Sequence, residues 1–125
     1  IVGIGATEQG EHPDKTAEML SAEAAEHAIA DAGLTKDDID GLITCKSIQG
    51  GGVDLDVGRL LGVSPPYSQT LDYGTCNFSI HLAAGAIATG RAEVIVLSYG
   101  ANARSASRNS SVSEPSGALP SGTAR

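Results

Sequence analysis

The segment that most constrains the fold spans residues 68–104, SQTLDYGTCNFSIHLAAGAIATGRAEVIVLSYGANAR. Residues 77–89 place apolar side chains on all sides of a helix, a pattern typical of helices inside a protein. Residues 93–99 then show no polar alternation before Ser98, which is typical of a parallel strand covered on both faces. The segment therefore predicts a strand, a sharp turn, a buried helix and a second strand that packs between layers.

The rest of the chain repeats this alternation of strands and helices. Strands are predicted at residues 1–6, 39–46 and 67–73. An amphipathic helix follows Thr16, a residue that can cap it. The helix dipole favours Glu18 in its first turn, and Gly33 is expected to end it. A shorter helix follows Asp54. The order β-α-β-α-β-α-β predicts an α/β layer structure with right-handed crossover connections.

The length of the chain, 125 residues, is that of one domain. We assign residues 1–101 to a single α/β domain. Residues 102–125 are rich in Ser, Gly and Pro, which predicts the start of a loop region, an insertion or disorder. Because no closing element follows the last predicted strand, we expect the chain to be a piece of a longer polypeptide.

The composition argues against several classes of protein. The formal net charge is -7, whereas nucleic-acid binding requires a basic surface. No apolar run approaches the roughly 20 residues of a membrane span, so we expect none. The two cysteines, Cys45 and Cys76, form no C-x-x-C motif, which argues against a metal site or a disulfide framework. Their scarcity favours a reducing, cytoplasmic location.

Two glycine-rich stretches partly match nucleotide-binding motifs. Residues 3–5 (GIG) begin a dinucleotide fingerprint, but Glu8 stands where the third glycine belongs, and a loop with Pro13 separates the motif from its helix. Residues 50–52 (GGG) are not followed by the G-K-[ST] of a P-loop. We interpret the first stretch as a strand whose glycines permit close packing and the second as a flexible loop, and we expect no bound cofactor.

The turn before helix 77–89 carries Tyr73, Gly74, Thr75 and Cys76. A thiol at this position lies near unpaired helix N–H groups and the positive end of the helix dipole, which favour a nucleophilic thiolate. A tyrosine there can donate a hydrogen bond or act as an acid. Either side chain can equally serve only in packing, and both alternatives stay open at this point.

No histidine is obviously placed as a base for Cys76. His12 and His27 lie in polar segments and are predicted at the surface. His81 lies in the apolar helix, where a lone histidine is usually a core or an interface residue. Cys45, at the end of a predicted strand, is interpreted as a small buried hydrophobe.

Several segments together resemble a known family. They are IVGIGATEQG, AEMLSAEAAEHAIADAGLTKDDIDGLIT, VGRLLGVSPP and DYGTCNFSIHLAAGAIATGRAEVIVLSYGANARS. In this order and at these intervals, residues 1–105 resemble the N-terminal half of a thiolase-superfamily subunit. More narrowly, they resemble the sterol-carrier-protein-X-type and lipid-transfer-protein thiolase-like group.

The resemblance implies a layered αβαβα fold, with a central mixed sheet and a buried helix in the half present here. It implies chemistry on acyl-CoA thioesters and a homodimer in which the strand at 67–73 pairs with its twin. It also implies that helix 77–89 carries the nucleophile at its N-terminus. We expect Gly74, Thr75 and Asn77 to bind the substrate there.

Two residues compete for the position of the nucleophile. Counting back from residues 86–87 without a gap places the family's nucleophile on Tyr73, whereas Cys76 takes that position if the turn is shifted by three residues. Members of the lipid-transfer-protein group often lack the nucleophile. Some resemble retro-aldolases that cleave steroid side-chain CoA thioesters with a small OB-fold partner subunit, and their catalytic groups lie in the other half.

The resemblance leads to three functional hypotheses. The main hypothesis is a thiolase-like acyltransferase of lipid metabolism that makes or breaks a carbon–carbon bond in an acyl-CoA, with Cys76 as nucleophile. The first alternative is a retro-aldolase, which deprotonates a β-hydroxyl and stabilises the enolate of the thioester. The second alternative is a non-catalytic thiolase-like subunit of a heteromeric complex.

Overall fold

A computed structural model describes residues 1–47, 51–72 and 75–105 of the chain, without the side chains of Thr75 and Cys76. Within these ranges, three parallel strands form one sheet in the order β2-β1-β3. The strands are β1 (Gly41–Cys45), β2 (Tyr67–Leu71) and β3 (Ile95–Tyr99). The mixed character that the resemblance implies for the sheet is not seen among these described strands, which all run in the same direction.

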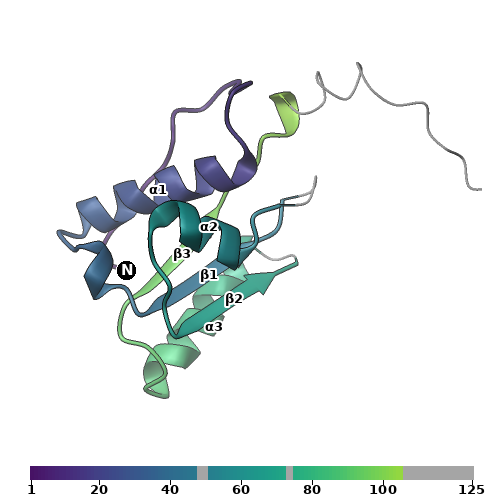
Figure 1. Cartoon of the computed structure of the whole chain (residues 1–125). Helices are drawn as coiled ribbons and strands as arrows, with labels where there is room; N and C mark the ends of the chain where they lie inside the picture. Colours follow the sequence, from purple (N-terminus) through teal and green to yellow (C-terminus); the bar gives the residue numbers. More distant parts are fainter. Residues whose placement is uncertain (48–50, 73–74, 106–125) are drawn as a thin grey trace, which may run out of the picture.

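The helices form a layer on each face of the sheet. Figure 1 shows α1 (Ala17–Asp31) and α2 (Asp54–Leu61) together on one face and α3 (Thr75–Ala88) on the other. A single 3₁₀ turn, η1 (Lys36–Asp38), connects α1 to β1. The α/β layer structure predicted from the alternation of patterns is therefore confirmed, with a helix between successive parallel strands.

Strand β1 lies at the centre of the sheet. All five of its residues are buried, and it pairs with β2 on one side and with β3 on the other. Leu42 belongs to the core under α1 and α2, and Ile43 is fully buried as well. Because successive side chains of a strand point to opposite faces, Ile43 faces the α3 side. The rest of the core on the α1 and α2 side consists of Ala22, Ala25, Ile29, Ile39, Val57, Leu61 and Val96.

The boundaries of α1 follow from its terminal residues. The hydroxyl of Thr16 accepts a hydrogen bond from the backbone N–H of Met19 at 3.2 Å, which satisfies one of the unpaired donors of the first turn. Gly33 follows the helix with φ of +68°, a left-handed conformation that glycine adopts without strain. Both positions were predicted from the sequence, and both predictions are confirmed.

The carboxylate of Asp40 fastens the amino ends of β1 and β3 together. It accepts hydrogen bonds from the backbone N–H of Val94 at 2.7 Å and of Glu93 at 2.8 Å. These two N–H groups lower the pKa of Asp40 despite the opposing effect of desolvation. The start of β3 is thereby fixed against the start of β1.

The first residues of the chain form no strand, which corrects the prediction for residues 1–6. The backbone N–H of Ile4 donates to the Asp31 carboxylate at 2.9 Å, and the segment runs along α1. At Gly3 a Cβ would collide with the carbonyl oxygen of Ala28, so the glycine does permit close packing, but against a helix. A strand needs a neighbouring strand for its backbone groups, and within the described ranges none lies beside this segment.

Helix α3 is covered on one side only, which corrects the prediction that it is buried all round. Its inward residues Ser79, Ala83 and Ala86 are buried against the sheet. In contrast, Phe78 is 67% exposed and Ile87 is 48% exposed on the outer side. The apolar sequence of the helix suits the interior of a protein. Full burial needs a second layer over its outer side, and the described part of the chain contains no such layer.

A carboxylate also anchors α2 to the edge strand β2. Asp54 is the first residue of α2, and its side chain accepts hydrogen bonds from the hydroxyls of Ser68 and Thr70, the latter at 2.6 Å. In return, the backbone N–H of Asp54 donates to the Thr70 hydroxyl at 2.8 Å. Desolvation acts to raise the pKa of Asp54, but the hydrogen bonds from Ser68 and Thr70 outweigh it and the pKa is lowered.

We predict that Asp54→Ala lowers the free energy of unfolding by about 2 kcal/mol at pH 7, because two hydroxyl donors lose an ionised acceptor. Urea denaturation of the variant and the unaltered protein measures the difference. Asp56→Ala is the matched control, since Asp56 lies in the same turn and its ion pair with Arg59 is solvent-exposed. A change of less than about 0.5 kcal/mol in Asp54→Ala would contradict this anchoring role.

The effect of Asp54→Ala should also depend on pH. Because the folded-state pKa lies below the ordinary value of 3.8, the carboxylate stabilises the fold at every pH above the unfolded-state value. This stabilisation is lost as the pH falls through the folded-state pKa. The difference in unfolding free energy between the two proteins should therefore shrink below a pH of about 4.

Candidate functional site

The carboxyl ends of the three strands meet at one edge of the sheet. In register, Cys45 of β1 lies between Leu71 of β2 and Tyr99 of β3. In open parallel sheets, ligands bind outside this edge because helices begin there and direct their free N–H groups toward it. Helix α3 begins here at Thr75, shortly after the end of β2. This edge is the candidate site.

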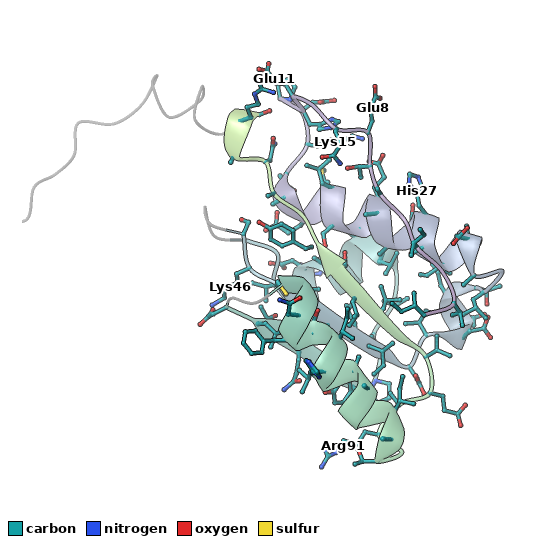
Figure 2. The ribbon with its side chains drawn as sticks, turned by 180° about the vertical axis from the view of Figure 1, so that it is seen from behind. Glu8, Glu11, Lys15, His27, Lys46 and Arg91 are labelled. Carbon is teal, nitrogen blue, oxygen red and sulfur yellow. The ribbon has the colours of Figure 1, made fainter. Side chains whose placement is uncertain are left out.

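An ion pair lies at this edge, directly after β1 and β2. The Lys46 ammonium lies 2.6 Å from the Asp72 carboxylate, and the Lys46 backbone N–H donates to the carbonyl of Leu71 at 2.9 Å. Both side chains are substantially exposed, at 45% for Lys46 and 71% for Asp72. Figure 2 shows Lys46 beside the N-terminal end of α3, whereas Arg91 marks the opposite end of that helix.

A carboxylate from α1 reaches the same edge. Glu18, in the first turn of the helix, accepts a hydrogen bond from the backbone N–H of Gly52 at 2.9 Å. Desolvation acts to raise its pKa, but hydrogen bonds from its own N–H, from Gly52 and from the Thr16 hydroxyl outweigh it and lower the pKa. The edge therefore carries two separate interactions, the ion pair of Lys46 with Asp72 and the hydrogen bond from Gly52 to the Glu18 carboxylate.

The structure locates the predicted site residues only in part. Tyr73 and Gly74 lie outside the described residues. Thr75 and Cys76 are the first two residues of α3, but their side chains lie outside the described part. Asn77 follows in the first turn and is exposed. The catalytic roles of Tyr73 and Cys76, and the substrate-binding roles of Gly74, Thr75 and Asn77, stay predictions.

The backbone of α3 presents N–H donors at the start of the helix. The first N–H groups of any α-helix have no partner within the helix, and they carry the positive end of its dipole. In α3 these groups belong to residues that follow β2 at the carboxyl edge. They could hold a negative charge that develops on the oxygen of a substrate carbonyl.

The three histidines do not lie together, although the backbone of His12 bonds to Asn102 and Ser105, which follow β3. His27 bonds to the carbonyl of Ala6 at 2.8 Å and lies on α1, across the sheet from α3 (Figure 2). His12 bonds to the carbonyl of Glu8 at 2.8 Å. His81 is exposed on α3, which corrects its interpretation as a core residue and leaves the interface alternative.

The sequence analysis missed three residues of this edge and interpreted a fourth correctly. Cys45 is 2% exposed at the end of β1, so its interpretation as a buried hydrophobe is confirmed. Lys46 and Asp72 were included in predicted strands, although a charge at the end of an apolar strand was an available signal. Glu18 was assigned only to the helix dipole, and its contact with Gly52 could not be read from residues 34 positions apart.

Comparison with known proteins adds relatives of this chain. No model of a protein family matches it. The chain is 38% identical over 112 residues to the steroid side-chain-cleaving aldolase of Thermomonospora curvata. It is 36% identical over 111 residues to the 17-hydroxy-3-oxo-4-pregnene-20-carboxyl-CoA lyase of Mycobacterium tuberculosis. Each match covers 86% of this chain but 28% of the relative, so the chain spans little more than a quarter of their length.

Two solved structures have a similar fold. The Ltp2-ChsH2(DUF35) aldolase superposes with a TM-score of 0.64 and 36% identity, over 75% of this chain and 25% of that one. The 3-oxoacyl-[acyl-carrier-protein] synthase III from Aquifex aeolicus VF5 superposes with a TM-score of 0.58 and 16% identity, over 74% and 32%. The fold is thiolase-like. At 16% identity the second likeness shows the fold alone, and membership of the narrower lipid-transfer-protein group stays a prediction.

Among the described residues, no helix combines the length and the apolar character that crossing a bilayer requires.

We predict that Lys46→Ala lowers the free energy of unfolding by no more than about 1 kcal/mol, because its ion pair with Asp72 is exposed to solvent. Chemical denaturation at low and high salt measures the change, and the small difference should fade at high salt. Lys36→Ala removes the exposed ion pair with Glu26 and serves as the matched control. A loss of several kcal/mol would show instead that the pair holds the sheet edge together.

Proposed function

We propose that the protein containing this chain cleaves a carbon–carbon bond of a β-hydroxyacyl-CoA thioester by a retro-aldol reaction. One observation carries the proposal: over 86% of its length the chain is more than one-third identical to an aldolase and to a carboxyl-CoA lyase. Its identity to the 3-oxoacyl-[acyl-carrier-protein] synthase III of similar fold is 16%. The retro-aldolase alternative is therefore preferred over the acyltransferase hypothesis.

The reaction makes specific demands on the protein. A base removes the proton of the β-hydroxyl, the bond between the α and β carbons breaks, and the hydroxyl-bearing carbon becomes a carbonyl. The electron pair of the broken bond passes to the α carbon as the enolate of the thioester, which then takes up a proton. No covalent enzyme intermediate is needed, but the enolate oxygen requires hydrogen-bond donors.

We assign the backbone N–H groups at the start of α3 as candidates for the donors to the enolate oxygen. They are fixed in place by a helix that packs along β1 and β3, so they need no reorganisation during the reaction. The base is proposed to come from the part of the protein outside this chain. This assignment is consistent with the positions of His12 and His27, which are engaged by backbone carbonyls near α1.

Acyl transfer through Cys76 is the second candidate function. The observation that favours it is the position of Cys76 as the second residue of α3, where the helix dipole favours a thiolate. In that reaction the thiolate would take the acyl group as a thioester, and a base from elsewhere in the protein would activate it.

We further propose that the protein works as an assembly. The related aldolase structure carries two component names, Ltp2 and ChsH2(DUF35), and we propose a small OB-fold partner subunit for this protein by analogy. A homodimer through β2 is also proposed, because within the described residues β2 pairs only with β1 and its other edge is available. If the protein is instead a non-catalytic subunit, the assembled complex would show no acyl-CoA turnover that depends on this chain.

We predict that Cys76→Ala in the full-length protein, assayed with its partner subunit, keeps most of its lyase activity. The reason is that retro-aldol cleavage needs no thiol nucleophile. The assay separates a β-hydroxyacyl-CoA from the ketone and the shortened acyl-CoA by chromatography.

The same variant, assayed with a 3-oxoacyl-CoA and free CoA as the substrates of acyl transfer, decides between the two enzymatic functions. Loss of turnover by more than about 10³-fold in Cys76→Ala, together with inactivation by iodoacetamide that follows labelling of Cys76, would favour acyl transfer. Turnover that begins only when the second subunit is added would support the heteromeric assembly.

A further inference from the structure

Glu18 reaches from one face of the sheet to the backbone that follows β1. Its side chain is half-buried, and its carboxylate accepts the Gly52 N–H at 2.9 Å. The carboxylate also lies directly against Gly51, where a Cβ would collide with it. Gly51 and Gly52 have φ angles of +77° and +80°, the left-handed region that favours glycine. Glycines at these two positions therefore adopt the left-handed backbone without strain, and the missing Cβ of Gly51 leaves room for the carboxylate.

The backbone held by Glu18 lies on the end of the central strand. The N–H of Ser47 donates to the carbonyl of Gly51 at 3.2 Å. A Cβ on Gly52 would lie 2.7 Å from the carbonyl oxygen of Cys45, the last residue of β1. Gly51 and Gly52 thus pack directly on the segment from Cys45 to Ser47. Lys46, which bonds to Asp72 just before the start of α3, is in the middle of that segment.

A role limited to the helix dipole does not account for these contacts. An acidic residue in the first turn stabilises a helix without contacting any other segment. Here the carboxylate contacts Gly51 and Gly52, 33 and 34 positions away in the chain. The hydrogen bonds that lower its pKa keep it ionised at neutral pH, when it is the stronger acceptor.

We propose that Glu18 is a positioning residue for the candidate site: its carboxylate holds Gly51 and Gly52 on the end of β1 and so fixes the edge bearing Lys46 and Asp72. This inference rests on the proposed function in one respect, namely that the acyl-CoA substrate binds at this edge. Glu18 itself is not assigned any contact with the substrate.

The test compares Glu18→Ala, Glu18→Gln and a matched control in the full-length protein with its partner. Glu26→Ala is the control, because it removes the same charge from the same helix and Glu26 contacts Lys36 rather than the site. The first readout is hydrogen exchange of the Gly52 amide, measured with the global stability of each variant. The second readout is kcat/KM for cleavage of a β-hydroxyacyl-CoA.

In Glu18→Ala we expect the Gly52 amide to exchange at least about tenfold faster, since a hydrogen bond to a charged acceptor is lost. We expect kcat/KM to fall at least about tenfold, because small misplacements at a site are costly. Glu18→Gln keeps an oxygen acceptor and should restore most of both, and Glu26→Ala should match the unaltered protein.

Two results would overturn the inference. One is unchanged Gly52 protection in Glu18→Ala, and the other is faster exchange with undiminished kcat/KM. Absence of cleavage by the unaltered protein would instead count against the proposed function. The exchange measurement would then decide the inference alone, with unchanged protection overturning it.

Discussion

The parallel pairing of β1 with both of its neighbours is the interaction on which the rest of the structure depends. Every residue of β1 is buried, so its backbone groups can be satisfied only by β2 and β3. Parallel pairing in turn requires a crossover between strands, and the two crossovers place α2 on one face and α3 on the other, while α1 packs beside α2. The layers, the core and the direction of α3 all follow from this central strand.

The same pairing creates the candidate site. Because the strands are parallel and in register, the residues after each strand meet at one edge, although Lys46 and Asp72 are 26 positions apart in the chain. Carboxylates fasten the structure around this sheet at separate points: Asp40 at the amino edge, Asp54 at β2 and Glu18 near the end of β1. Each accepts protein hydrogen bonds that lower its pKa, which favours the charged form in a partly desolvated position.

The one-sided burial of α3 and the extended path of residues 1–6 have a common physical origin. An apolar helix and an apolar strand each need a second surface, and within the described residues that surface is not present. Phe78 and Ile80 are exposed on α3, and Ile1, Val2 and Ile4 are exposed in the first segment. The sequence pattern reports the environment that a segment prefers, whereas the structure reports the neighbours that this chain provides.

Local patterns determined the three longer helices and the three paired strands of the described residues. Thr16 and Gly33 mark the ends of α1, and the uninterrupted apolar run at residues 93–99 predicts β3, because capping and burial follow from neighbouring residues. The position of Cys76 near the N-terminus of α3 was likewise evident from the order of the residues. Only the tertiary structure brought Glu18 to Gly52 and Lys46 to Asp72. Such contacts depend on how layers pack and strands align, and one sequence does not record which distant residues become neighbours.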